Sequence, residues 1–422
     1  MRAHRKLRVL REPAYRRLFL GRATSLIGDG ISPIALAFAV LDLTGSATDL
    51  GIVFACHSLV LVAFVLVGGV VSDRISPRRT MLGADLVRVV SMGLIAALLL
   101  AGVAEIWQLT LLYAIDGAGS AFFNPASNAI VPQIVPGRRL QEANALLSFS
   151  RWAGKVAGPA LAGVLLALGS PGIALAADAA TFGVSAACLW GVRAPRLRAA
   201  GESEPFLREL RHGWSEFSSR SWMIAVVFSA AITNAIFFPI FQVLGPTVAN
   251  ESLDGSSSWA LIAAFWGVGG LLGGLVALNV RPRRPLLVSE GFILLFPLPV
   301  VLLAIPSPTV AIAAGAMVAA STISLAEVLY DTTCAEHIPQ ETLSRVMAYE
   351  WFGSLALEPI GLALVGPLAV ALGISTTLWL GAAAMFACLL AVLLVPSVRR
   401  LETRVTTEPT PTPPPRPIEP GD

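Results

Sequence analysis

Gly68–Arg79, with the sequence GGVVSDRISPRR, lies between two long apolar runs and decides the fold. One carboxylate and three arginines are concentrated in this segment, in a chain of 422 residues that is 55% hydrophobic and only 14% charged. A soluble domain usually has about 25% charged residues. Because so few charges cannot cover a water-facing surface, we expect an all-α, polytopic membrane protein. A loop this short and this basic then fixes which side of the membrane it occupies.

The apolar runs predict twelve membrane-spanning helices. About 20 apolar residues cross a bilayer, and backbone polar groups in hydrocarbon must be satisfied within the segment. The first run follows a basic arm and ends without a small-residue cleavage site, so we expect a retained helix rather than a signal peptide. The expected spans are 18–41, 48–71, 80–102, 107–129, 143–168, 172–192, 222–247, 258–280, 285–305, 309–332, 346–371 and 375–396.

The basic residues predict the orientation. All but four of the 30 Lys and Arg residues precede the first run, follow the last run or fall in every second loop. The other four, which lie inside the runs, are Arg22, Arg88, Arg151 and Lys155. The intervening loops carry acids instead: Asp42, Asp49, Glu105, Glu251 and Asp254. Cytoplasmic loops carry an excess of Lys and Arg, so we expect both termini to be cytoplasmic.

The longest connection, about Arg193 to Arg220, divides the chain into two six-helix bundles. The expected domains are a basic cytoplasmic arm (1–17), an N-terminal bundle (18–192), a cytoplasmic linker (193–221), a C-terminal bundle (222–396) and a disordered, proline-rich cytoplasmic tail (397–422). In the linker, four apolar residues at helical spacing favour an amphipathic helix on the membrane surface, although a solvated linker is the alternative. They are Phe206, Leu210, Trp214 and Phe217.

The two bundles resemble each other weakly, which predicts pseudo-symmetric halves. Leu140–Gly169 and Leu343–Gly373 both follow a short loop on the expected cytoplasmic side, both contain an X-Pro pair and both end in Leu-Gly. The pairs are Gly158-Pro159 and Glu358-Pro359. Repeated halves are typical of secondary transporters.

With these features in place, the opening segment resembles the loop 2–3 signature of the major facilitator superfamily. The matching residues are Gly69, Asp73, Arg74, Arg78 and Arg79, while Ser76 and Pro77 replace the usual Gly and Arg. Five further stretches resemble the branch of bacterial drug, macrolide and siderophore exporters: Ala84–Arg88, Ala121–Ala126, Ala143–Leu146, Gly158–Gly163 and Asp178–Phe182. The resemblance implies a monomer in a bacterial inner membrane. It also implies that Asp73 latches the two halves together, whereas the arginines are equally explained as topology determinants and contacts of anionic lipids.

The fifth predicted helix is similar to the antiporter motif of the superfamily in Gly154, Gly158, Pro159 and Gly163, with Ala162 where a second glycine is common. Glycines one turn apart allow a neighbouring helix to approach closely, and a proline lets the helix bend. Ordinary tight packing would require the same residues. Another export motif is missing, because Tyr113 stands where the fourth helix usually has an arginine.

Charges near the bilayer centre cost on the order of 3 kcal/mol, so they face a protein interior or a wet cavity. Asp29, Asp116, Glu358, Arg151 and Lys155 are expected near mid-membrane. The resemblance implies that helices 1, 4, 7 and 10 line a central cavity, which adds Asn234 and Glu327 as candidates for proton or substrate binding. The alternative for Asp29 is a structural pair with Arg151, Lys155 or Arg22. Asp85 and Arg88 are expected near the inner surface, paired with each other.

These residues predict a secondary active transporter rather than an enzyme. The four histidines are scattered, and no Gly-x-x-x-x-Gly-Lys-Ser/Thr loop for a nucleotide occurs. We therefore expect no cofactor and no nucleic-acid partner, and a proton gradient as the energy source. The resemblance implies proton-coupled efflux of an amphipathic small molecule, of the drug, macrolide or siderophore kind, by alternating access. A nutrient or lysolipid transporter of the same fold is the alternative.

Overall fold

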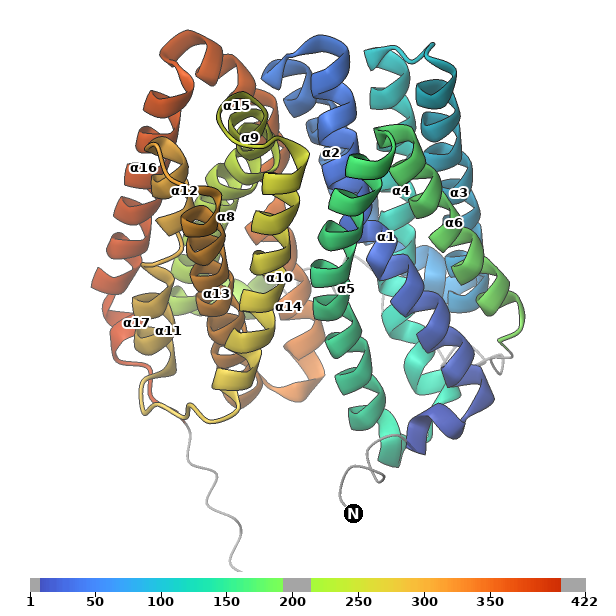
Figure 1. The fold of residues 1–422 in the computed structure, drawn as a ribbon. Helices are drawn as coiled ribbons and strands as arrows, with labels where there is room; N and C mark the ends of the chain where they lie inside the picture. Colours follow the sequence, from blue (N-terminus) through green and yellow to red (C-terminus); the bar gives the residue numbers. More distant parts are fainter. Residues whose placement is uncertain (1–7, 193–213, 404–422) are drawn as a thin grey trace, which may run out of the picture.

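The computed structural model describes residues 8–192 and 214–403, except for the side chains of a few residues that include Gly69, Asp73, Arg74, Arg138 and Arg345. Every regular element in this part of the chain is helical (Figure 1). The N-terminal half contains η2 (Arg8–Arg11), α1 (Pro13–Thr44), α2 (Ala47–Ile75), α3 (Pro77–Ala101), α4 (Ile106–Ile134), η3 (Gly137–Arg139), α5 (Leu140–Leu168) and α6 (Pro171–Trp190). The C-terminal half contains α8 (Ser221–Pro239), η4 (Ile240–Leu244), α9 (Gly245–Ser252), α10 (Ser256–Ala277), α11 (Pro285–Ile293), α12 (Leu298–Ala304), α13 (Thr309–His337), α14 (Gln340–Leu355), α15 (Glu358–Leu372), α16 (Ile374–Leu394) and α17 (Pro396–Arg399).

Ten helical segments among the described residues are long and apolar enough to cross a membrane. The two expected spans that are not among the ten correspond to α4 and α5, each a helix of 29 residues. Both contain polar and charged residues, such as Asp116 in α4 and Arg151 and Lys155 in α5, which lower their hydropathy. The all-helical membrane fold is therefore confirmed, whereas the number twelve and the orientation stay predictions.

Three of the expected spans are interrupted helices. A π-helical turn, η4, follows Pro239 between α8 and α9. The segment Pro285–Ala304 divides into α11 and α12 before Pro297-Leu298-Pro299, and Val346–Leu372 is divided before Glu358-Pro359. Proline lacks the N–H that would continue the helical ladder, and sharp kinks in helices are almost always found at such positions. Every interruption lies in the C-terminal half.

Small residues bring the two halves into contact. Between the halves, α5 packs on α10 and α2 packs on α15. A Cβ atom on Gly267 of α10 would lie 2.4 Å from the Lys155 carbonyl oxygen of α5, and one on Gly366 of α15 would lie 2.5 Å from Cα of Thr48 of α2. Only glycine fits at such distances, so the contact between the halves depends on these positions.

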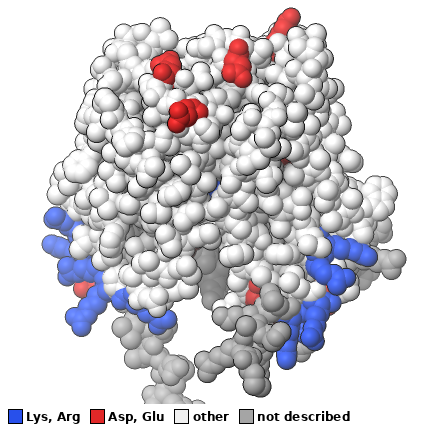
Figure 2. Space-filling view, viewed as in Figure 1, with Lys and Arg blue, Asp and Glu red and all other residues white. Residues whose placement is uncertain are grey.

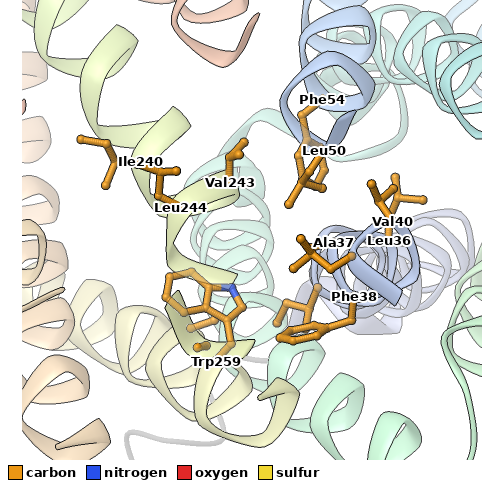
Figure 3. Close-up of a cluster of buried hydrophobic side chains, with 14 of the residues drawn as sticks. Leu36, Ala37, Phe38, Val40, Leu50, Phe54, Ile240, Val243, Leu244 and Trp259 are labelled. Carbon is orange, nitrogen blue, oxygen red and sulfur yellow. The ribbon is translucent and has the colours of Figure 1, made fainter. Parts of the chain in front are cut away.

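The charged residues gather at opposite ends of the molecule. Lys and Arg are grouped at the end that carries the N-terminus, and several Asp and Glu lie at the other end (Figure 2). We call these the basic end and the acidic end. Toward the acidic end, an apolar cluster joins the halves, with Phe38 and Val40 of α1, Phe54 of α2, Leu244 of η4 and Trp259 of α10 (Figure 3). The core is therefore continuous between the halves on this side.

The segments at either end of the bundles are partly structured. Tyr15 donates a hydrogen bond to the Ala143 carbonyl oxygen (2.8 Å), so the described part of the basic arm packs on the start of α5. The tail does not begin at residue 397 as expected, because Val398 is buried in α17 and the Thr403 N–H donates to the Arg283 carbonyl oxygen. Phe217 of the linker is buried against the C-terminal half. Residues 193–213, which include Phe206 and Leu210 of the expected amphipathic helix, and residues 404–422 lie outside the described part of the chain.

Candidate functional site

A buried charge network centred on Arg88 occupies the interior of the N-terminal half. Arg88 Nη2 donates to Asp29 Oδ1 at 2.6 Å, and Arg88 Nε donates to Asp116 Oδ1 at 3.0 Å. Only 5% of the Arg88 side chain and 2% of the Asp116 side chain are exposed, against 30% for Asp29. His57 Nε2 lies 3.4 Å from Asp116 Oδ2, and its ring stacks on Tyr113. Asp29 and Asp116, predicted separately as candidates, are thus joined by one guanidinium.

The expected pairing of Arg88 with Asp85 near the inner surface is wrong. Arg88 follows Pro77, the first residue of α3, by eleven residues, which corresponds to roughly 16 Å of helix and places it at mid-height. It crosses to α1 and α4 instead of bonding within its own helix. Asp85 is fully buried, and its carboxyl lies beside Ser185 of α6 rather than in an ion pair with Arg88. The structural alternative for Asp29, a pair with Arg151, Lys155 or Arg22, is also not observed.

The Asp29 segment of α1 is held between α5 and α6. A Cβ on Gly28 would lie 2.2 Å from Asp178 Oδ1 of α6, and a Cβ on Gly30 would lie 2.9 Å from the Gly154 carbonyl oxygen of α5. The Arg88 guanidinium lies 3.7 Å from the centre of the Phe182 ring, which closes the network on the side of α6. Two glycines therefore let the backbone around Asp29 approach its neighbours closely and aim the carboxylate at Arg88.

The network opens on a cavity of about 340 Å³ that reaches into the other half. Asp29, His57 and Asp116 line it from the N-terminal half, and Gln242 and Glu358 line it from the C-terminal half. Glu358, predicted on an unbroken helix, instead begins α15 at the interruption before Pro359. The structure thus brings three of the predicted acids, Asp29, Asp116 and Glu358, to one cavity.

A larger cavity of about 1040 Å³ lies between the halves on the side of the basic end. It shares Asn124, Trp351 and Leu355 with the smaller cavity. Its wall includes four more of the predicted residues: Arg151, Lys155, Asn234 and Glu327. Lys155 also lies 4.4 Å from the centre of the Trp152 ring, and it is close enough to Glu327 to interact electrostatically. Drug-sized pockets measure about 300–1,000 Å³, so this space suits a bulky organic molecule.

Asn234 has a structural contact at the interruption between α14 and α15. Its Nδ2 donates to the Ser354 carbonyl oxygen at 3.1 Å. In a continuous helix, that carbonyl would accept from the N–H of Glu358. Asn234 therefore satisfies a backbone group that the helix interruption frees, while the side chain lines the larger cavity.

The opening segment Gly68–Arg79 is only partly described. Gly69, Asp73 and Arg74 lie outside the described side chains, so the proposed latch is not tested. Arg78 donates from Nε to the Leu189 carbonyl oxygen (3.0 Å) and from Nη2 to the Trp190 carbonyl oxygen (2.6 Å). It thus caps the C-terminal end of α6, where a cation is favoured by the helix dipole. Arg79 is exposed.

The glycines of α5 pack where the sequence predicts close approach. A Cβ on Gly158 would lie 2.6 Å from Cα of Gly30, and one on Gly154 would lie 2.7 Å from the Leu26 carbonyl oxygen. Gly163 faces Ala260 of α10 in the other half. Pro159 lies inside α5, which continues through it to Leu168. The motif therefore joins α5 to the segment of α1 that carries Asp29.

Five charged or titratable residues that line the cavities were not among the proton or substrate candidates: Arg88, His57, Glu290, Asp331 and Glu350. Arg88 was misplaced because the start of its helix was set three residues late and its partners lie on other helices. His57 was grouped only with the scattered histidines, because no spacing in the sequence links it to Asp116 on another helix. Glu290 lies early in an apolar run, yet it is buried and lines the larger cavity.

A comparison with known families identifies the fold that holds these cavities. The model of the Major Facilitator Superfamily matches residues 18–354. The chain belongs to this superfamily. It is a multi-pass membrane transporter of the kind in which two helical bundles enclose a central site.

Two bacterial relatives in the superfamily match long parts of the chain. Macrolide efflux protein A of Streptococcus pyogenes is 25% identical over 284 residues, which cover 66% of this chain and 70% of that protein. Multidrug efflux pump Tap of Mycolicibacterium fortuitum is 26% identical over 398 residues, which cover 90% of this chain and 95% of that protein. These relatives agree with the exporter branch indicated by the sequence.

Solved structures of two other transporters share the fold. A mutant of the peptide transporter POT has a TM-score of 0.75 at 12% identity, covering 92% of this chain and 96% of that one. The nucleoside transporter NupG has a TM-score of 0.68 at 14% identity, covering 90% and 98%. At such identities the similarity concerns the fold alone.

Proposed function

We propose that this chain is a secondary active exporter of amphipathic small molecules in a bacterial inner membrane, and that it exchanges its substrate for protons. The observation that carries the proposal is the Asp29–Arg88–Asp116 network, which lines the smaller cavity between the two halves. Relatives named for macrolide and multidrug efflux support the direction of transport. The two halves would rock about this cavity, with the basic end facing the cytoplasm.

The network provides a place for proton exchange because its net charge changes whenever one of its carboxylates or His57 binds a proton. One guanidinium faces two carboxylates, and His57 approaches the second of them. Asp29 is the carboxylate more exposed to the cavity. A proton that neutralises Asp29 would loosen its bond to Arg88, and a movement of α1 against α3 could follow. Asp29 is thus the preferred proton acceptor, with Asp116 as the fixed partner of Arg88.

An export assay in a pump-deficient bacterial host tests the proposal. Cells that express the wild-type chain should accumulate less of an amphipathic drug than cells with empty vector, and a protonophore should abolish the difference. Asp29→Asn should remove proton-driven export, whereas Glu251→Gln, an exposed site at the acidic end, should not. Export that persists with the protonophore would refute proton exchange, and greater accumulation than in the vector control would indicate uptake instead.

A further inference from the structure

The larger cavity has a buried carboxylate that has no hydrogen-bond or ion-pair partner among the described residues. Glu290 of α11 is only 4% exposed, and its side chain lines the cavity. No described residue forms a hydrogen bond or ion pair with it. An ionised carboxylate that leaves water without a partner carries a large desolvation penalty. A group that binds in the cavity and carries positive charge would remove that penalty.

The charges on the cavity wall are divided between the halves. The basic residues that line it, Arg151 and Lys155, both belong to α5 of the N-terminal half. They lie within electrostatic range of Glu327 across the cavity and favour its charged form. Glu290, Asp331 and Glu350 line the C-terminal wall, where the described lining residues include no Lys or Arg. The C-terminal wall therefore has uncompensated negative charge.

Aromatic side chains lie on the same wall. Trp266 and Phe296 line the cavity with their ring centres 6.2 Å apart, and Phe237 stacks behind both of them. Aromatic faces attract organic cations, and the attraction is strongest where water is excluded. The combination of a buried carboxylate and aromatic rings suits a cation with an apolar body better than a small hydrated ion.

We propose that the C-terminal wall is a subsite for the positively charged amine of an amphipathic substrate, with Glu290 as the anchoring carboxylate and Trp266 and Phe296 as the apolar contacts. The proposal rests on the proposed export function and specifies its substrate class: amphiphiles with a positive charge. Glu350, which lies near Asp331 and Glu327, adds to the field that attracts the amine. The Arg88 network remains separate from this subsite.

Equilibrium binding of two dyes to the purified chain in detergent tests the subsite without any transport. Nile blue and Nile red share one ring system, but Nile blue is cationic and Nile red is neutral. We expect the wild-type chain to bind Nile blue at least about tenfold more tightly than Nile red, as expected for a hydrogen bond to a charged group. Glu290→Gln should weaken the binding of Nile blue by a similar factor and leave the affinity for Nile red unchanged. Glu350→Gln should weaken Nile blue less, and Glu251→Gln should have no effect.

The binding and export results together decide whether the amine subsite exists. Equal affinity of the wild-type chain for both dyes would overturn the subsite. An equal loss of affinity for both dyes in Glu290→Gln would also overturn it, provided that the variant elutes as a monodisperse peak. If Glu290→Gln does not fold, the wild-type comparison and Glu350→Gln still decide. Selective binding of Nile blue without any export in cells would support the subsite and refute the proposed function. Export of Nile red as effective as that of Nile blue would support the function and refute the subsite.

Discussion

Arg88 on α3 and Asp116 on α4 form an ion pair of 3.0 Å in which both side chains are at least nineteen-twentieths buried. A buried pair is weak support for stability, but breaking it by removing one partner leaves an uncompensated charge. Here the loss of Arg88 would leave two carboxylates, because Asp29 also depends on it. Arg88 is therefore expected to be the most sensitive position of the network.

We predict that Arg88→Gln lowers the free energy of unfolding by about 3–5 kcal/mol. The double variant Arg88→Gln/Asp116→Asn should recover part of this loss, because it removes a buried charge together with its partner. Denaturant unfolding of the purified protein in detergent measures both, with Arg281→Gln at an exposed site as the control. If the loss of stability in the double variant equals the sum of the losses in Arg88→Gln and Asp116→Asn, the two residues are not coupled.

The contact between Gly158 and Gly30 predicts a second sensitive site. Gly158→Leu should be destabilising by about 1–3 kcal/mol, since overpacking displaces neighbouring backbone, and should abolish export because α1 carries Asp29. Gly93→Leu on α3 is the matched control, since a Cβ at Gly93 meets nothing within 4 Å. Normal export by Gly158→Leu would show that α1 and α5 can separate without loss of function.

The sequence was sufficient for the helical membrane fold and for finding several of the charged residues that line the cavities, because apolar runs and intramembrane charges are local signals. The ion pairs between helices were not predictable from such local signals. Arg88 contacts α1 and α4, and only the packing of three helices around Gly28 and Gly30 selects Asp29 and Asp116 over the nearer Asp85. The interruption at Glu358 was also missed. Gly158-Pro159 lies within a continuous α5, so the same X-Pro signal gives a different backbone in each half.

The bond from Asn234 to Ser354 predicts a local effect at the interruption between α14 and α15. Asn234→Leu would leave the Ser354 carbonyl without this donor, at a cost of about 1–3 kcal/mol. Hydrogen exchange should then rise in the segment that includes Glu358. The control is Asn279→Leu, whose side-chain bond lies within its own helix turn at an exposed site. Unchanged exchange near Glu358 would mean that another group or water satisfies the carbonyl.

The approach of Gly366 to Thr48 predicts a way to separate the two halves at the acidic end. In Gly366→Leu, the Cβ atom alone would lie 2.5 Å from the Thr48 Cα. The contacted atom belongs to the backbone, which cannot move away by a rotamer change. The halves should move apart there, so a spin-label pair at Thr44 and Ser375, in a background without the native cysteines, should give a longer distance. Gly291→Leu, where a Cβ meets nothing within 4 Å, is the matched control.

The same variant distinguishes a role in movement from a role in binding. If the α2–α15 contact closes the acidic end during the transport cycle, Gly366→Leu should lose export while purified protein still binds Nile blue, because the lining of the larger cavity includes neither helix α2 near Thr48 nor α15. Loss of both export and binding would show that the contact shapes the cavity itself. An unchanged distance with full export would show that the halves do not depend on this contact.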